Sequence, residues 1–258
     1  MSKISAVTKE HCASKTWRVV NALGTARQEA VVLLAASELP MALMSCPAGF
    51  ISGAKGYQLV AIQGFDPGVN LQVTQNGKWQ GAYLPRIYRC PPFLLVSTSD
   101  GGRALCVDEN VAEIEEHGGE PFYGDDGELA PKVAEVLRTL VDFEKERIAT
   151  DNVCTQLAEL ALIEPWDITV NKGQGQSKIQ GLFRIDEAKL SQLDGAQLEQ
   201  LRNSGGLVLA YCQLLSMQNL SKLGRLYQEQ QRAQSDVIEG LQAFGMSAQD
   251  GTLSFENL

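Results

Sequence analysis

Apolar positions in the first half of the chain occur in short runs that end at turn residues, a pattern typical of β-strands. The clearest hairpin signal is Asn76-Gly77, because both residues tolerate the positive φ of a tight turn. It lies between Leu71 and Val73 on one side and Trp79 on the other. We predict that residues 1–127 are mainly β-structure with hairpins; the expected strands include 17–20, 57–65, 93–96 and 104–107.

In the second half, apolar residues recur at intervals of three and four, the spacing of one helix face. Two helical stretches are predicted, at residues 131–148 and 153–161. Asp186 and Asp194 are expected to cap two short helices, and Gly205-Gly206 to interrupt the chain. A third hairpin is expected around the glycine-rich turn at 173–175. Residues 128–226 are therefore predicted to be mainly helical, and the chain to be an α+β protein.

The pattern predicts one long final helix, from Leu207 to about Phe244. Along its second part, apolar and glutamine positions alternate three and four apart, as in a coiled-coil seam with a polar middle. A helix with so thin an apolar stripe often needs a partner to cover it, so we expect this seam to bind another protein chain. The apolar seam residues are Leu223, Tyr227, Val237, Leu241 and Phe244.

With 258 residues, 44% of them hydrophobic, the chain is large enough for a substantial core. We predict one domain over residues 1–226, made of the β-rich and helix-rich parts, followed by a helical extension and tail at 227–258. Six cysteines without a C-x-x-C pair indicate buried thiols in a reducing compartment, with a disulfide framework as the alternative.

The charge balance and the apolar runs limit the classes of partner. Lys+Arg 22 against Asp+Glu 31 gives a net charge of -9, which disfavours nucleic acid because phosphate is repelled. The longest apolar run, residues 30–36, is too short to span a membrane, so no membrane insertion is expected. Residues 1–10 contain no apolar signal core, so we expect synthesis in the cytoplasm without a secretory signal.

Several separated stretches form a recognisable set by their order and spacing: residues 77–86 with Arg89 and Pro92-Phe93, and residues 106–109, 119–127, 162–166, 181–187 and 210–217. Together they resemble the SapC family of bacterial surface-layer-associated proteins, over roughly residues 5–226. The resemblance implies a fold and the kinds of protein beside which members of the family occur. The family is associated with paracrystalline surface layers, and its members occur beside flavin-dependent halogenase-like and oxygenase-like proteins. It implies no established reaction.

Residues suited to catalysis or metal binding are sparse. His11 lies in a polar N-terminal segment, and His117 follows two glutamates and precedes two glycines, which does not fit a His-x-carboxylate iron site. The acidic segment from Asp108 to Asp126 lacks the EF-hand order and is expected to be a solvated loop, with a weak calcium site as the alternative. We therefore predict no catalytic residue, no metal site and no cofactor.

Trp79, Tyr83, Arg86 and Tyr88 form the most interface-like cluster, because Trp, Tyr and Arg dominate binding hot spots. The alternative is ordinary packing, with Trp79 on the core and Arg86 paired with Asp108 or Glu109.

Three functions remain open at this stage. The first is a non-enzymatic structural or assembly protein that forms homo- or hetero-oligomers with other chains on a cell surface or in a virion. The second is an accessory partner that presents a substrate to a flavin-dependent halogenase or oxygenase. The third is an unrecognised enzyme that uses carboxylates between Asp108 and Asp126.

Overall fold

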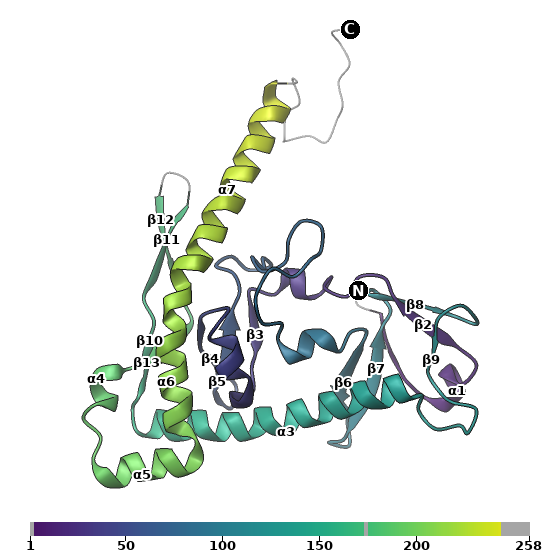
Figure 1. Cartoon of the computed structure of the whole chain (residues 1–258), viewed down its shortest axis with the longest axis horizontal. Helices are drawn as coiled ribbons and strands as arrows, with labels where there is room; N and C mark the ends of the chain where they lie inside the picture. The colour runs from purple at the N-terminus through teal and green to yellow at the C-terminus, as the bar shows by residue number, and fades with distance from the viewer. Residues whose placement is uncertain (1–2, 173–174, 244–258) are drawn as a thin grey trace.

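The computed structural model of the chain describes residues 3–172 and 175–243, and it is an α+β fold (Figure 1). Most strands precede residue 127 and most helices follow it, as predicted from the hydrophobic pattern. The strands are β1 Ile4–Ala6, β2 Thr16–Val19, β3 Val31–Leu33, β4 Ala48–Gly53, β5 Gly56–Ile62, β6 Phe93–Ser97, β7 Arg103–Asp108, β8 Ala112–Glu115, β9 Glu120–Pro121, β10 Ile163–Pro165, β11 Ile168–Lys172, β12 Gly175–Ile179 and β13 Leu182–Ile185. The helices are α1 Lys9–Cys12, α2 Leu39–Ala42, α3 Pro131–Glu159, α4 Glu187–Leu190, α5 Gly195–Ser204, α6 Gly206–Ser216 and α7 Leu220–Ala243, with 3₁₀ turns η1 Ala26–Gln28, η2 Ala36–Glu38, η3 Arg86–Arg89 and η4 Met217–Asn219.

A five-stranded antiparallel sheet in the order β10-β13-β4-β5-β3 forms the centre of the molecule. Alternate residues of its strands enter different cores, because successive side chains of a strand point to opposite faces. Phe50 and Ala61 lie in the core under α3, α5 and α6, whereas the adjacent Ile62 and Leu182 lie in the core covered by α7. Both faces of the sheet are therefore buried.

Two smaller sheets, β1-β7-β6 and β8-β2-β9, enclose a separate core. Trp17, Phe93 and Phe122 pack there edge to face or tilted, with ring centroids 4.8 to 6.5 Å apart. The 29-residue helix α3, about 44 Å long at 1.5 Å per residue, joins this core to the central one. Val133 near its start lies in the small core and Leu157 near its end in the central core.

Several predicted local features are confirmed. β6 and β7 form the expected hairpin, and β11 and β12 pair around residues 173–174, which lie outside the described residues. Asp186 and Asp194 accept hydrogen bonds from the backbone N–H groups of Lys189 and Gln197, so each caps a short helix. Gly205 ends α5 in the left-handed region at φ 82°, a conformation that glycine adopts without strain.

Other expectations were wrong in detail. The Asn76-Gly77 turn forms, but only a single bridge, Val73 to Trp79, follows from it. The two stretches predicted at 131–148 and 153–161 are one continuous helix, α3. The single helix expected from Leu207 is divided by η4 into α6 and α7, and Phe244 lies outside the described residues.

The two halves predicted from the hydrophobic pattern share one sheet, because β4 of the first half pairs with β13 of the second. None of the helices in the described ranges combines the length and apolar character needed to cross a membrane. All six cysteines are free thiols, five of them buried, and burial raises the pKa of Cys46 and of Cys154 to about 12.

We expect Tyr227→Ala to lower the free energy of unfolding by about 3–5 kcal/mol, because it removes a buried aromatic ring from the core under α7. Urea unfolding followed by circular dichroism measures this. The control, Gln228→Ala, changes an exposed neighbour and should shift stability by less than about 0.5 kcal/mol. Equal stability of the two variants would show that α7 does not belong to the folded core.

Candidate functional site

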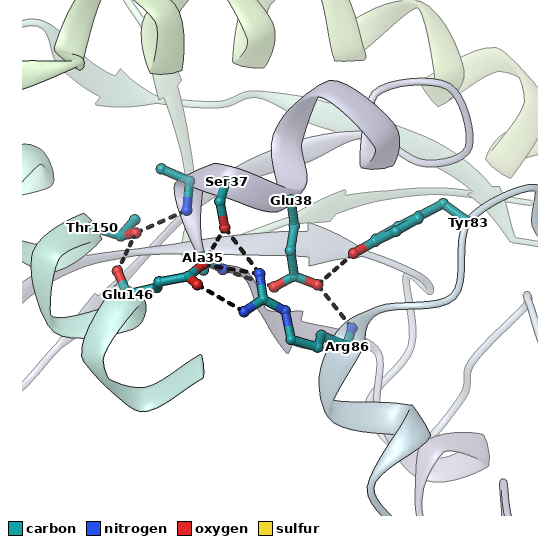
Figure 2. A network of polar contacts seen from close by, with 8 residues as sticks. Ala35, Ser37, Glu38, Tyr83, Arg86, Glu146 and Thr150 are labelled. Atoms are coloured by element: carbon teal, nitrogen blue, oxygen red, sulfur yellow. Dashed lines mark hydrogen bonds and ion pairs between the residues drawn. The ribbon is translucent and has the colours of Figure 1, made fainter. Parts of the chain in front are cut away.

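The buried carboxylate of Glu38 joins η2 to the segment from Tyr83 to Arg86 (Figure 2). Glu38 is only 3% exposed and accepts hydrogen bonds from the backbone N–H of Ala35 at 3.0 Å and of Arg86 at 2.8 Å. The hydroxyl of Tyr83 donates to the same carboxylate at 2.7 Å. Burial, followed by this hydrogen bond, raises the pKa of Tyr83. The phenol therefore stays protonated and acts as a donor.

Arg86 adds a second connection, from the first residue of η3 to α3. Its guanidinium donates two hydrogen bonds to the Glu146 carboxylate, at 3.0 and 2.9 Å, and one to the Ser37 hydroxyl at 3.0 Å. The paired geometry of this contact is the strong form of an arginine–carboxylate interaction. The expected pairing of Arg86 with Asp108 or Glu109 is therefore wrong: Asp108 accepts from Asn110, and Glu109 pairs with Lys3.

The two other residues of the predicted cluster also make internal contacts. The indole N–H of Trp79 donates to the backbone oxygen of Tyr83 at 3.0 Å, and its ring packs against that of Tyr88, with centroids 5.8 Å apart. Tyr88 is buried, and its hydroxyl lies 2.7 Å from the Glu29 carboxylate. The cluster thus holds the chain together, and its binding to a partner stays a prediction.

Two residues of the predicted C-terminal seam are covered by their own chain. Leu223 and Tyr227 are 1% and 2% exposed, and the Tyr227 ring packs edge to face on Phe65 with its hydroxyl 3.0 Å from Asp66. They are therefore not available on the surface. The side chains of Val237 and Leu241, and the whole of Phe244, lie outside the described part of the chain.

The outer face of α6 is the exposed apolar surface that the sequence reasoning missed. Val208, Tyr211 and Leu215 are 54–62% exposed and recur at helical spacing, three and four residues apart. Met41 and Met44, also exposed, lie on and just after α2, which packs against α6. Among the described residues, five of the nine large exposed apolar side chains thus lie on or beside α6.

The signal for this surface was present in the sequence. α6 reads GLVLAYCQLLS and is apolar on every side, a composition typical of a helix that is covered all round. In the structure only one face is covered, the face that carries Leu209, Ala210 and Gln213. A groove of about 650 Å³ runs along α6 and ends at the ion pair between Arg184 and Glu164, at 2.8 Å. The site is therefore a half-buried apolar helix with a polar margin.

The residues considered for catalysis do not converge. His11 in α1 and His117 in the turn after β8 are both exposed. The carboxylates between residues 108 and 126 lie at several strand ends with different partners, such as Arg18 for Glu113 and Lys132 for Glu120. In the residues that the structure describes, no group of three or more histidines, cysteines or carboxylates is placed to hold a metal ion.

A family model described as SapC matches residues 8–223 of the chain. No curated protein and no solved structure matches it.

Glu38→Gln should lower the free energy of unfolding by about 1.5–3 kcal/mol. The two carboxylate oxygens accept three hydrogen bonds, whereas the amide of glutamine has only one acceptor oxygen. Chemical unfolding of the variant against wild type measures the loss. The exposed Glu159→Gln serves as control and should stay within about 0.5 kcal/mol. A loss no larger than in the control would mean that the network does not stabilise the fold.

Stability should also fall in acid. The hydrogen bonds from Arg86 and from Arg147 are the largest causes that hold the pKa values of Glu146 and of Glu144 below their usual range. Each depressed pKa stabilises the fold above the ordinary carboxyl pKa and ceases to do so as the pH falls through the folded value. Unfolding free energy should therefore decline from about pH 5 to about pH 3.

The Arg86→Met variant separates this effect from general acid sensitivity. Its decline between the same pH values should be shallower than that of wild type, because Glu146 then loses its cation. The control Arg202→Met removes an exposed pair with Glu199 and should leave the pH slope unchanged. A wild-type slope in Arg86→Met would refute the assignment.

Proposed function

Since the chain belongs to the SapC family, we propose that it is a non-enzymatic assembly protein that acts through contacts between protein chains, with the outer face of α6 as the contact surface. The observation that carries this proposal is the row of Val208, Tyr211 and Leu215, exposed on a helix whose opposite face lies in the core. Burying the exposed part of each side chain would contribute about 1–2 kcal/mol to association.

The attachment of α6 to the central sheet supports a role as a contact surface, because a rigid surface loses little entropy on binding. The buried Gln213 side chain accepts a hydrogen bond from Ile185 N–H at 2.9 Å and donates to the Ala48 oxygen at 3.0 Å. Ser216 accepts from the Ala48 N–H at 2.9 Å. These bonds join the inner face of α6 to β4 and β13, so the outer face is held in place before any partner arrives.

We infer that the partner is a second copy of the chain. A row along one helix can pack against the same row of another copy about a two-fold axis, which makes the contact self-complementary. Assembly on a cell surface or in a virion is consistent with this mode of action. No cofactor is part of the proposal, and the scattered carboxylates between 108 and 126 give the enzymatic alternative no geometric support.

Light scattering and sedimentation velocity test the proposal. Wild type should form a defined oligomer, and the double variant Tyr211→Ser with Leu215→Ser should weaken association at least tenfold, which corresponds to about 1.4 kcal/mol. Ile148→Ser, which changes an exposed apolar residue on α3, is the matched control and should assemble like wild type. A monomeric wild type, or a double variant that assembles normally, would overturn the proposal.

A further inference from the structure

A cavity of about 440 Å³ lies between the central sheet and the smaller sheet β1-β7-β6, over the middle of α3. This volume is within the range of small-molecule sites, roughly 300–1,000 Å³. Most of its lining is apolar, contributed by β3, by β6 and the residues before it, and by Leu140 and Phe143 of α3. Its volume and its mostly apolar lining suit a small organic molecule.

The walls of the cavity are two strand edges. Consecutive residues of β3 and of β6 line it, whereas a cavity on the face of a sheet would contact only every second residue. β3 and β6 are the end strands of their sheets. Backbone groups of Val31, Leu33 and Leu95 point away from their paired strands, toward the cavity. Four backbone hydrogen bonds establish which residues of β3 and β6 face their paired strands and which face away. They run from Leu34 N to Leu59 O, Gln63 N to Ala30 O, Thr98 N to Gly102 O and Asp108 N to Pro92 O.

Two carboxylates of the lining, Glu29 and Asp108, have no counter-charge among the described residues; Asp108 accepts hydrogen bonds from Asn110, which leaves Glu29 as the candidate for a ligand. Glu29 is half-buried, and its carboxylate accepts a hydrogen bond from the Tyr88 hydroxyl. In the part of the chain that the structure describes, no cation forms an ion pair with it. The basic groups of the lining are already in ion pairs, because Arg103 and Arg147 both pair with Glu144. Burial raises the pKa of Glu29, as expected for a carboxylate that lacks a cation.

We propose that this cavity binds a small organic amine, with an apolar body between β3 and β6 and a protonated amino group on Glu29. An ammonium group has three N–H donors, which suit the Glu29 carboxylate together with outward-pointing backbone carbonyls of the strand edges. Its charge would be neutralised by Glu29 in a poorly solvated place, where a charge-assisted hydrogen bond is strong. A ligand carboxylate would instead be repelled.

This site is independent of the α6 surface and goes beyond the assembly role. It is also the feature that presentation of a small molecule to an enzyme would require. Because the α6 variants described above leave the cavity lining unchanged, failure of assembly and failure of ligand binding can be told apart.

Three probes of matched shape test the proposal on the full chain: 4-phenylbutylamine, 4-phenylbutan-1-ol and 4-phenylbutyrate. Calorimetry should give the amine at least tenfold tighter binding than the alcohol, and the carboxylate the weakest. Amide chemical shifts of Val31, Leu33 and Leu95 should move on titration with the amine. Glu29→Gln, which keeps an acceptor for Tyr88, should abolish the preference for the amine.

Two further variants make the result specific. Glu159→Gln, an exposed glutamate outside the lining, should keep the wild-type order of affinities. Ala22→Trp places a large ring at the exposed rim of the cavity and should weaken amine and alcohol alike. The proposal is overturned if no probe binds, if the alcohol or the acid binds as well as the amine, or if Glu29→Gln keeps the preference.

Discussion

The network around the buried carboxylate of Glu38 is the constraint that holds η2, the segment from Tyr83 to Arg86 and α3 together. A charge removed from water is tolerated only when donors surround it. Here they come from the neighbouring Ala35 and, across the chain, from Tyr83 and the backbone of Arg86. Arg86 then reaches Glu146 on α3. Because η3 begins at Arg86, this network also fixes the direction in which Tyr88 enters the core. The wall of the cavity is thus set by a carboxylate that does not line it.

The cavity follows from the way the sheets are joined. α3 contacts both β5 and β6, so one helix holds the central sheet and the smaller sheet at a fixed separation. β3 and β6 end their sheets without pairing with each other, and their edges would otherwise be open to another strand. Placing these edges over α3 partly covers them and leaves a mostly apolar space, in which Tyr88 and Glu29 lie beside the backbone amides of the strand edges. A cavity of this kind requires no insertion or special loop.

Local features could be predicted from the sequence, and contacts between distant residues could not. The caps at Asp186 and Asp194 and the β6–β7 hairpin depend on residues a few positions apart, so the local sequence is enough to predict them. The family was also recognised, because its stretches keep their order. The pairing of β4 with β13 and the contact of Arg86 with Glu146 join segments whose proximity no periodicity encodes. Glu29 gave no signal, since one glutamate in a polar stretch is ordinary until Tyr88 and the strand edges surround it.

The two final helices show why a stripe alone does not decide exposure. α7 carries the thinner apolar stripe, yet Leu223 and Tyr227 pack in a core that also contains Phe65 and Trp166. α6 is apolar all round, but the sheet can cover only one side of it. Apolar surface therefore stays exposed where a helix is apolar on more faces than other elements of the fold can cover. α6 contacts β13 and β4, whereas the cavity lies beyond β3 at the end of the same sheet. A chain that assembles through α6 would thus keep its cavity accessible, so the two proposed activities are compatible in one molecule.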